Sequence, residues 1–206
     1  MNKYLRYILI GIMAFGIAFS MAAETADGIL KKAATSINGA GGLTASFTLD
    51  YGQQKISGSL KASGKKFALQ TPSSSTWYDG KNMWTYNPKN NETTLMTPTP
   101  QEVAEANPLS IVNSYSTSFT AAFAKVKTNG SQTIVLTPKS KQAGYKSVHV
   151  TIPDGSSFPS KIVVIPSSGQ KVTVGISQVK TGQKLAESTF VYPKNKYPKA
   201  EIVDLR

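Results

Sequence analysis

Apolar and polar residues alternate one by one over long stretches of this chain, and this alternation limits the folds that are open to it. In the run from Leu43 to Tyr51 every second residue is apolar and the residues between are polar. A period of two is typical of a β-strand with one buried face. The same pattern, or a short apolar run between turn residues, predicts further strands at Ile56–Ala62, Phe67–Leu69, Glu92–Thr97, Ala124–Thr128, Thr133–Thr137, Lys146–Ile152, Ser160–Ile165, Lys171–Val179 and Ser188–Tyr192.

Turns rich in glycine, asparagine and proline separate these strands, for example at Asn129–Gly130 and at Pro153–Gly155. Many short strands with such spacing favour a large antiparallel sheet that curls into a barrel. No break in composition and no repeat of fixed period divides the chain. We therefore expect one domain over residues 23–206.

Two stretches carry a helical pattern instead. Apolar residues recur at helical spacing in Glu24–Asn38, where Thr25 can cap the start and the glycines of Gly39–Gly42 can end the helix. Between Pro98 and Lys125 the strand pattern is interrupted, and Pro100–Ala106 has a proline and acidic residues where a helix would begin. We expect one to three short helices in this insertion.

The first 22 residues have the arrangement of a secretory signal peptide. A basic start, Met1–Arg6, precedes an uncharged apolar run at Tyr7–Phe19 and small residues before a cleavage point after Ala22 or Ala23. The apolar run is shorter than the ~20 residues that a membrane span needs. We expect the signal peptide to be cleaved and the protein to be exported into a bacterial periplasm.

Composition excludes several classes of function. The chain has no cysteine and one histidine, which argues against disulfides, thiolate metal sites, a cysteine nucleophile and multi-histidine metal sites. The formal net charge is +12, but the lysines are spread along the chain rather than clustered, so we expect no nucleic-acid partner. His149 has no nucleophile motif beside it, and Glu102 and Glu105 fit the first turn of a helix. We therefore expect no enzyme activity, no cofactor and no metal, and a secreted hydrolase with a cryptic site stays open as an alternative.

The clearest hairpin in the sequence is Thr76–Pro88. With Gly80–Lys81 as its two-residue loop, a glycine occupies the first loop position, as a type II′ turn requires. Counting outward from the loop pairs Trp77 with Trp84 and places both, together with Tyr86, on one face. Pattern alone leaves open whether the apolar side chains of the sheet fill a core or line a cavity.

This hairpin, followed by Glu92 and by Asn107–Leu109, resembles the periplasmic outer-membrane lipoprotein carrier (LolA-like) family. The order of elements after residue 24 and the ending Tyr197–Arg206 are also similar to that family. The resemblance implies a mainly β fold, an unclosed antiparallel half-barrel with an N-terminal helix and a helical lid. It also implies a monomer whose cavity takes the acyl chains of lipoproteins from an inner-membrane ABC transporter and passes them to an outer-membrane acceptor.

One departure from the family concerns the lid. Characterised relatives have an arginine after the second strand that hydrogen-bonds to the lid, whereas this chain has Lys65 and Lys66 within Ala62–Phe67. Lysine supplies charge without the planar fork of arginine. The absence of a cysteine for lipid attachment favours the soluble carrier over a membrane-anchored receptor. A periplasmic sensor of lipids or lipoproteins with the same fold is a further alternative.

These considerations lead to two sets of expected site residues. For the acyl-chain cavity we expect Phe47, Leu49, Leu60, Phe67, Leu69, Trp77, Trp84, Tyr86 and Met96. For the lid we expect Val103, Leu109, Ile111, Val112, Phe119 and Phe123.

Overall fold

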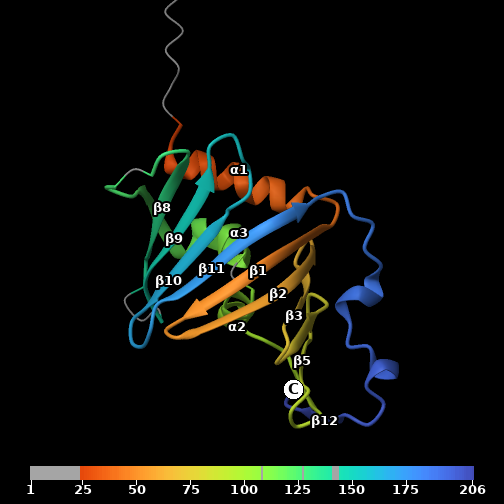
Figure 1. Cartoon of the computed structure of the whole chain (residues 1–206). Coiled ribbons are helices and arrows are strands. Elements are labelled where there is room, and N and C mark those ends of the chain that lie inside the picture. Colours follow the sequence, from red (N-terminus) through yellow and green to blue (C-terminus); the bar gives the residue numbers. More distant parts are fainter. Residues whose placement is uncertain (1–23, 108, 127, 141–143) are drawn as a thin grey trace, which may run out of the picture.

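In the computed structural model, the described residues form a single twelve-stranded sheet that is strongly curved and does not close on itself (Figure 1). The sheet wraps around three α-helices. The structure describes residues 24–107, 109–126, 128–140 and 144–206, so the expected signal peptide lies outside the described residues. Among the described residues, no helix is long and apolar enough to cross a bilayer. The open, curved sheet and its helices confirm the expected mainly β half-barrel.

The helices are α1 (Ala26–Asn38), α2 (Pro100–Ala106) and α3 (Leu109–Ser118), with 3-10 turns η1 (Glu187–Phe190) and η2 (Lys194–Lys196). The strands are β1 (Leu43–Tyr51), β2 (Gln54–Ser63), β3 (Lys66–Gln70), β4 (Ser75–Tyr78), β5 (Met83–Asn87), β6 (Glu92–Met96), β7 (Phe119–Phe123), β8 (Ser131–Pro138), β9 (Tyr145–Pro153), β10 (Lys161–Pro166), β11 (Val172–Lys180) and β12 (Glu201–Asp204).

The strand order shows how the two halves of the chain meet. It runs β12-β6-β5-β4-β3-β2-β1-β11-β10-β9-β8-β7. Strand β1 lies at the junction, because it pairs with β2 on one side and with β11 on the other. All pairs are antiparallel except β12 with β6, which is parallel. The two edge strands, β12 and β7, do not pair with each other, so the barrel stays open.

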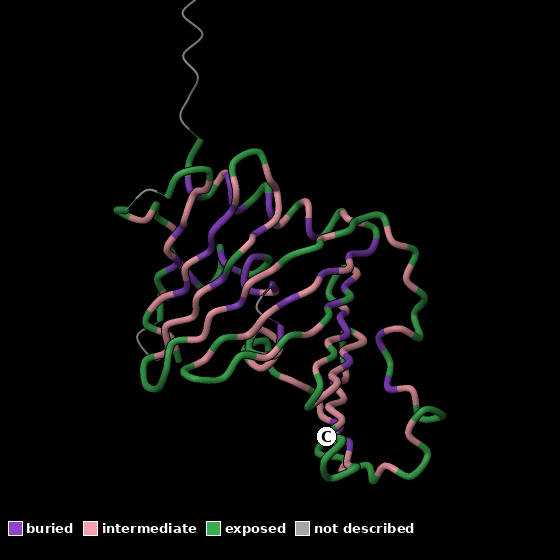
Figure 2. The backbone as a smooth tube through the Cα atoms, in the orientation of Figure 1, coloured by how far each residue is buried: buried purple, intermediate pink, exposed green. Residues whose placement is uncertain are grey.

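The inner face of the sheet, defined here as the face that the helices cover, carries the main core. Helix α1 begins at the Thr25 cap, whose hydroxyl accepts a hydrogen bond from the Gly28 N–H at 3.0 Å, and it turns Leu30 and Ala33 fully into this core. Helix α3 is joined to α1 by the Tyr115 hydroxyl, which donates to the Asp27 carbonyl at 3.1 Å. Buried stretches alternate with half-buried ones along the strands (Figure 2).

A second, smaller core lies on the outer face of the sheet. The C-terminal segment, residues 181–200, runs along the outside of the hairpin strands (Figure 1). Its Phe190 and Tyr192 pack against Ala68 and Trp77, with the Trp77 and Tyr192 ring centroids 5.6 Å apart. The hairpin register expected from the sequence is confirmed, because Trp77 pairs with Trp84.

Two expected strands are wrong. The strand expected at Ala124–Thr128 lies earlier, as β7, because Phe119–Phe123 pairs with β8 and the chain bends away after Ala124. The strand expected at Ser188–Tyr192 is largely the 3-10 turn η1. The alternation there reflects Phe190 and Tyr192 both packing on the outer face rather than pairing with a strand. The ending Tyr197–Arg206, which resembles that of the family, contains strand β12, and this strand joins the sheet in parallel.

Candidate functional site

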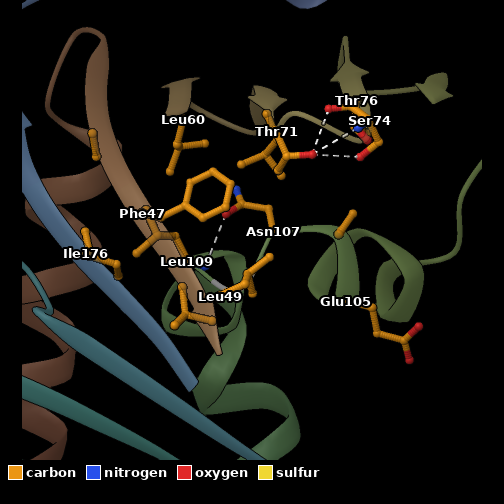
Figure 3. A pocket seen from close by; sticks show the side chains of 14 residues that line it. Phe47, Leu49, Leu60, Thr71, Ser74, Thr76, Glu105, Asn107, Leu109 and Ile176 are labelled. Atoms are coloured by element: carbon orange, nitrogen blue, oxygen red, sulfur yellow. Dashed lines mark hydrogen bonds between the residues drawn. The ribbon is translucent and has the colours of Figure 1, made fainter. Parts of the chain in front are cut away.

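An apolar cavity lies between the inner face of the sheet and the junction of α2 and α3 (Figure 3). Its volume is about 160 Å³. Strands β1, β2, β3 and β11 form its floor, and the end of α2 with the start of α3 covers it. The lining residues are Ala45, Phe47, Leu49, Leu60, Leu69, Thr71, Ser74, Thr76, Glu105, Ala106, Asn107, Leu109, Val174 and Ile176.

Strand register explains why the floor is apolar. Directly paired residues of neighbouring strands project from the same face of a sheet. Phe47 pairs with Ile176, Leu49 pairs with Val174, and Leu60 pairs with both Ala45 and Leu69. The alternation of four strands therefore meets in one apolar surface, to which Leu109 of α3 adds from above.

Polar groups lie along one rim of this cavity. The Thr71 hydroxyl accepts a hydrogen bond from the Ser74 N–H at 3.0 Å and donates to the Ser74 carbonyl at 3.1 Å, which closes the turn between β3 and β4. Thr76 adds a further hydroxyl. Glu105 also lines the cavity, but its carboxylate points away from the centre in Figure 3. The site therefore suits a molecule with an apolar tail and an uncharged polar end.

Helix α2 covers the cavity and packs only shallowly on the core, against which Val103, Ala104 and Ala106 are half-buried. None of its seven residues, all of which are described, is buried. Its N-terminus is fixed instead by a capping box, in which the Thr99 N–H and hydroxyl donate to the Glu102 carboxylate at 2.7 and 2.9 Å. These hydrogen bonds lower the pKa of Glu102 below its usual value.

A second hollow flanks α2 on its other side. Its volume is about 770 Å³, and Gln101 and Ala104 of α2 line it together with Ser114 of α3 and Tyr145 of β9. Burial, and secondarily the Glu105 carboxylate, raises the pKa of Tyr145. Helix α2 therefore separates two spaces and is the least firmly packed part of the helical insertion.

The structure places the expected cavity residues in three groups. Phe47, Leu49, Leu60 and Leu69 line the cavity together. Phe67 and Met96 lie on the same inner face, but they belong to the adjoining core. The expectation that the cavity is also lined by Trp77, Trp84 and Tyr86 is corrected. These three side chains pack on the outer face with the C-terminal segment. The physical reason is strand alternation: Trp77 pairs with Ala68, whose side chain points opposite to those of Phe67 and Leu69.

The expected lid residues are also divided among different elements. Val103 lies on α2 and is half-buried, whereas Leu109, Ile111 and Val112 are buried on α3. Of these, Leu109 lines the cavity. Phe119 and Phe123 do not belong to the helical insertion, since both lie on strand β7.

Two signals in the sequence point to some of the lining residues that sequence analysis did not select. Ala45 shares the alternation of Phe47 and Leu49, and Val174 and Ile176 alternate in the same way on β11. Asn107 belongs to the Asn–Pro–Leu stretch that carried the family resemblance. Nothing in the sequence indicated Thr71, Ser74 and Thr76, because their place depends on the turn between β3 and β4.

At the position of the family arginine, Lys66 has its ion-pair partner in the C-terminal segment. Lys66 projects from the outer face and forms an ion pair with Glu187 of η1. This ion pair links the C-terminal segment to β3. The Lys66 side chain therefore lies on the outer face of the sheet, whereas α2 covers the inner face.

The remaining candidates for chemistry are dispersed. His149 lies on β9, and its Nε2 is 3.2 Å from the Ser147 hydroxyl. Glu102 is engaged in the capping box described above. In the described part of the chain, no three His, Asp or Glu side chains gather as ligands of a metal would.

The chain is similar to several solved structures, and the first of the three given below supports the fold. An uncharacterized conserved protein from Thermus thermophilus matches with a TM-score of 0.58 and 14% identity, over 87% of this chain and 98% of that one. The LolA superfamily protein NE2245 from Nitrosomonas europaea matches with a TM-score of 0.43 and 12% identity, over 82% of this chain and 98% of that one. MucB in the MucA/MucB complex of Pseudomonas aeruginosa matches with a TM-score of 0.42 and 11% identity, over 81% of this chain and 60% of that one.

Comparison at the level of sequence gives the family. No curated protein matches the chain. A family model, described as outer membrane lipoprotein carrier protein LolA, matches residues 17–169, which is most of the chain. With its open half-barrel and helix-covered apolar cavity, the chain belongs to the LolA family of outer membrane lipoprotein carrier proteins.

Proposed function

We propose that this protein is a periplasmic carrier that shelters the acyl chains of lipoproteins and transfers them from the inner to the outer membrane. The observation that carries the proposal is the apolar cavity beneath α2, a helix with no buried residue among its described positions. A site that must take up and release a large apolar group needs a cover that opens at small cost. Helix α2 fits this requirement because its core contacts, made by Val103, Ala104 and Ala106, are only half-buried.

The size of the cavity supports an opening motion. An enclosed apolar cavity of about 150 Å³ holds a molecule such as benzene, and the cavity here is about 160 Å³. A complete acyl chain is several times larger than benzene. In our proposal, displacement of α2 would therefore extend the cavity toward the hollow on its other side.

Sheltering an acyl chain is a large energetic task. Burying one methylene group contributes ~0.8 kcal/mol, so a chain of ~16 carbons carries on the order of 12 kcal/mol. Contacts with the aliphatic side chains of the floor are non-directional and can be made with chains of different length. In our proposal an inner-membrane ABC transporter loads the carrier, an outer-membrane acceptor unloads it, and the carrier works as a monomer without catalysis or a cofactor.

The test is binding of an environment-sensitive fluorescent probe attached to an acylated peptide. We expect a blue shift and saturable thermal stabilisation, because a ligand that binds only the native state raises its stability. Ile176→Trp fills the cavity and should abolish binding. Val163→Trp places the same side chain on the outer face, where residue 163 pairs with His149 and Thr173, and should leave binding intact.

Two results would contradict the carrier proposal. Absence of a blue shift with the unaltered protein would exclude an acyl-binding cavity. Turnover of soluble ester substrates that is lost in Ile176→Trp would support a hydrolase instead.

A further inference from the structure

One amide group inside the cavity has an unused hydrogen-bond donor. Asn107 lies between α2 and α3, lines the cavity, and is only 7% exposed. Its Oδ1 accepts a hydrogen bond from the Leu109 N–H at 3.2 Å. Its Nδ2 has no hydrogen-bond partner among the described residues.

The accepted hydrogen bond fixes which way the amide faces. Oxygen and nitrogen of an asparagine side chain are assigned from their partners, and a backbone N–H requires the oxygen. The oxygen therefore faces the first turn of α3, and the nitrogen faces the other way. In Figure 3 the amide of Asn107 projects among Phe47, Leu60 and Leu109, toward the space that these side chains enclose.

This donor faces space that a ligand can enter. Nδ2 of Asn107 is not among the buried side-chain atoms that lack a partner, so it reaches the water-accessible space of the cavity. The residues of the cavity floor are aliphatic or aromatic and offer no acceptor. A ligand with an acceptor at this depth would therefore give Nδ2 a partner that the protein itself does not supply.

We infer that Nδ2 of Asn107 donates to the carbonyl oxygen of the ester or amide that links an acyl chain to the rest of its molecule. This inference rests on the proposed acyl-binding function and adds a specificity determinant to it. The aliphatic floor holds the hydrocarbon of any alkyl chain, whereas Asn107 distinguishes an acyl chain from an alkyl chain without a carbonyl. The carrier would thus select esters and amides of fatty acids over ethers of the same length.

The test compares two ligands that differ only in the carbonyl group. One neutral fluorescent peptide carries a palmitoyl ester on a serine, and the other carries a hexadecyl ether at the same position. We expect the unaltered protein to bind the ester about three- to tenfold more tightly, the factor that one net hydrogen bond supplies. Asn107→Asp keeps an oxygen that can cap α3 but, as a carboxylate, has no hydrogen to donate, so the ratio should fall to about one.

A matched control is Asn113→Asp at an exposed position of α3 outside the cavity, which should keep the full preference for the ester. Asn107→Ala serves if Asn107→Asp does not fold. An unchanged ratio in the Asn107 variants, an equal loss of both ligands, or equal binding of both ligands by the unaltered protein would each overturn the inference and leave the carrier proposal standing. Failure of the unaltered protein to bind either ligand would overturn both.

Discussion

The aromatic ring of Phe47 lies over Gly58, its partner on the neighbouring strand. A Cβ atom at position 58 would come within 2.5 Å of Phe47 Cζ and within 2.4 Å of the Gln70 carbonyl oxygen. The absence of a side chain at position 58 therefore sets the position of the ring on the cavity floor. Space for a ligand depends on this contact.

We therefore expect Gly58→Ala to displace the Phe47 ring into the cavity and to lower both stability and acyl binding. Overpacking of this kind costs about 1–3 kcal/mol. Urea unfolding and fluorescent-acyl titration measure the two effects. Ser57→Ala, at the exposed neighbouring position, is the control and should change neither. Full retention of acyl affinity in Gly58→Ala would show that the ring does not limit the cavity.

Two tyrosines of the helical side form a matched pair. The hydroxyl of Tyr145 is buried without a hydrogen-bond partner among the described residues, whereas that of Tyr115 donates to the Asp27 carbonyl at 3.1 Å. Removing an unsatisfied group relieves a desolvation cost, while removing a bonded one loses about 0.5–1.5 kcal/mol. Tyr145→Phe should therefore be neutral or stabilising in urea unfolding, and Tyr115→Phe should be destabilising. The opposite order would mean that the two hydroxyl environments are wrongly assigned.

The capping box makes the cover of the cavity sensitive to acid. The pKa of Glu102 in the folded protein lies below its usual value of 4.5, because Thr99 donates to the carboxylate. A lowered folded pKa stabilises the folded form above the usual value, and this stabilisation is lost as the pH falls through the folded pKa. Amide protection of residues 101–106 should therefore decrease on acidification from about pH 6 to about pH 3.

Glu102→Gln tests this assignment, because glutamine keeps the hydrogen-bonding geometry of the box but does not titrate. Its amide protection in α2 should be independent of pH in the same range. A decrease equal to that of the unaltered protein would assign the acid sensitivity to another group.

Stability and ligand binding should separate at Trp77. Its side chain is 4% exposed and packs with Phe190 and Tyr192 on the outer face, away from the cavity. Trp77→Ala should lower the free energy of unfolding by about 3–5 kcal/mol and leave the acyl affinity of the folded protein unchanged. Leu69→Ala, on the neighbouring strand but facing inward, should alter acyl affinity as well. An affinity loss in Trp77→Ala at a temperature where the protein remains folded would contradict this separation.

Alternation along single strands was sufficient to predict most of the sheet and part of the site. The period of two in Leu43–Tyr51 places Phe47 and Leu49 on one face, and both line the cavity. It did not indicate which face of the Thr76–Pro88 hairpin turns inward, because both faces carry large apolar side chains. That choice is made by Phe190 and Tyr192, which reach the outer face from more than a hundred residues away.

The hydrogen-bond donor that Asn107 presents to the cavity could not be predicted from the sequence, for a related reason. Asn107 follows α2 at a position where an asparagine would ordinarily cap the next helix, and its oxygen does so. Whether its nitrogen meets solvent, protein or an empty space depends on the strands that lie opposite, above all on β1 and β11. Local pattern carries no information on such long-range packing.

The pairing of β1 with β11 has a consequence for how the protein is made. Phe47 and Ile176 are partners in this pair, yet one is near the start of the chain and the other is near its end. A chain that emerges from a ribosome or a translocation channel with its N-terminus first cannot complete the cavity floor until β11 has followed. Contacts of such long sequence separation also slow folding. For the proposed carrier this means that a nascent chain cannot bind acyl chains before its synthesis is almost complete.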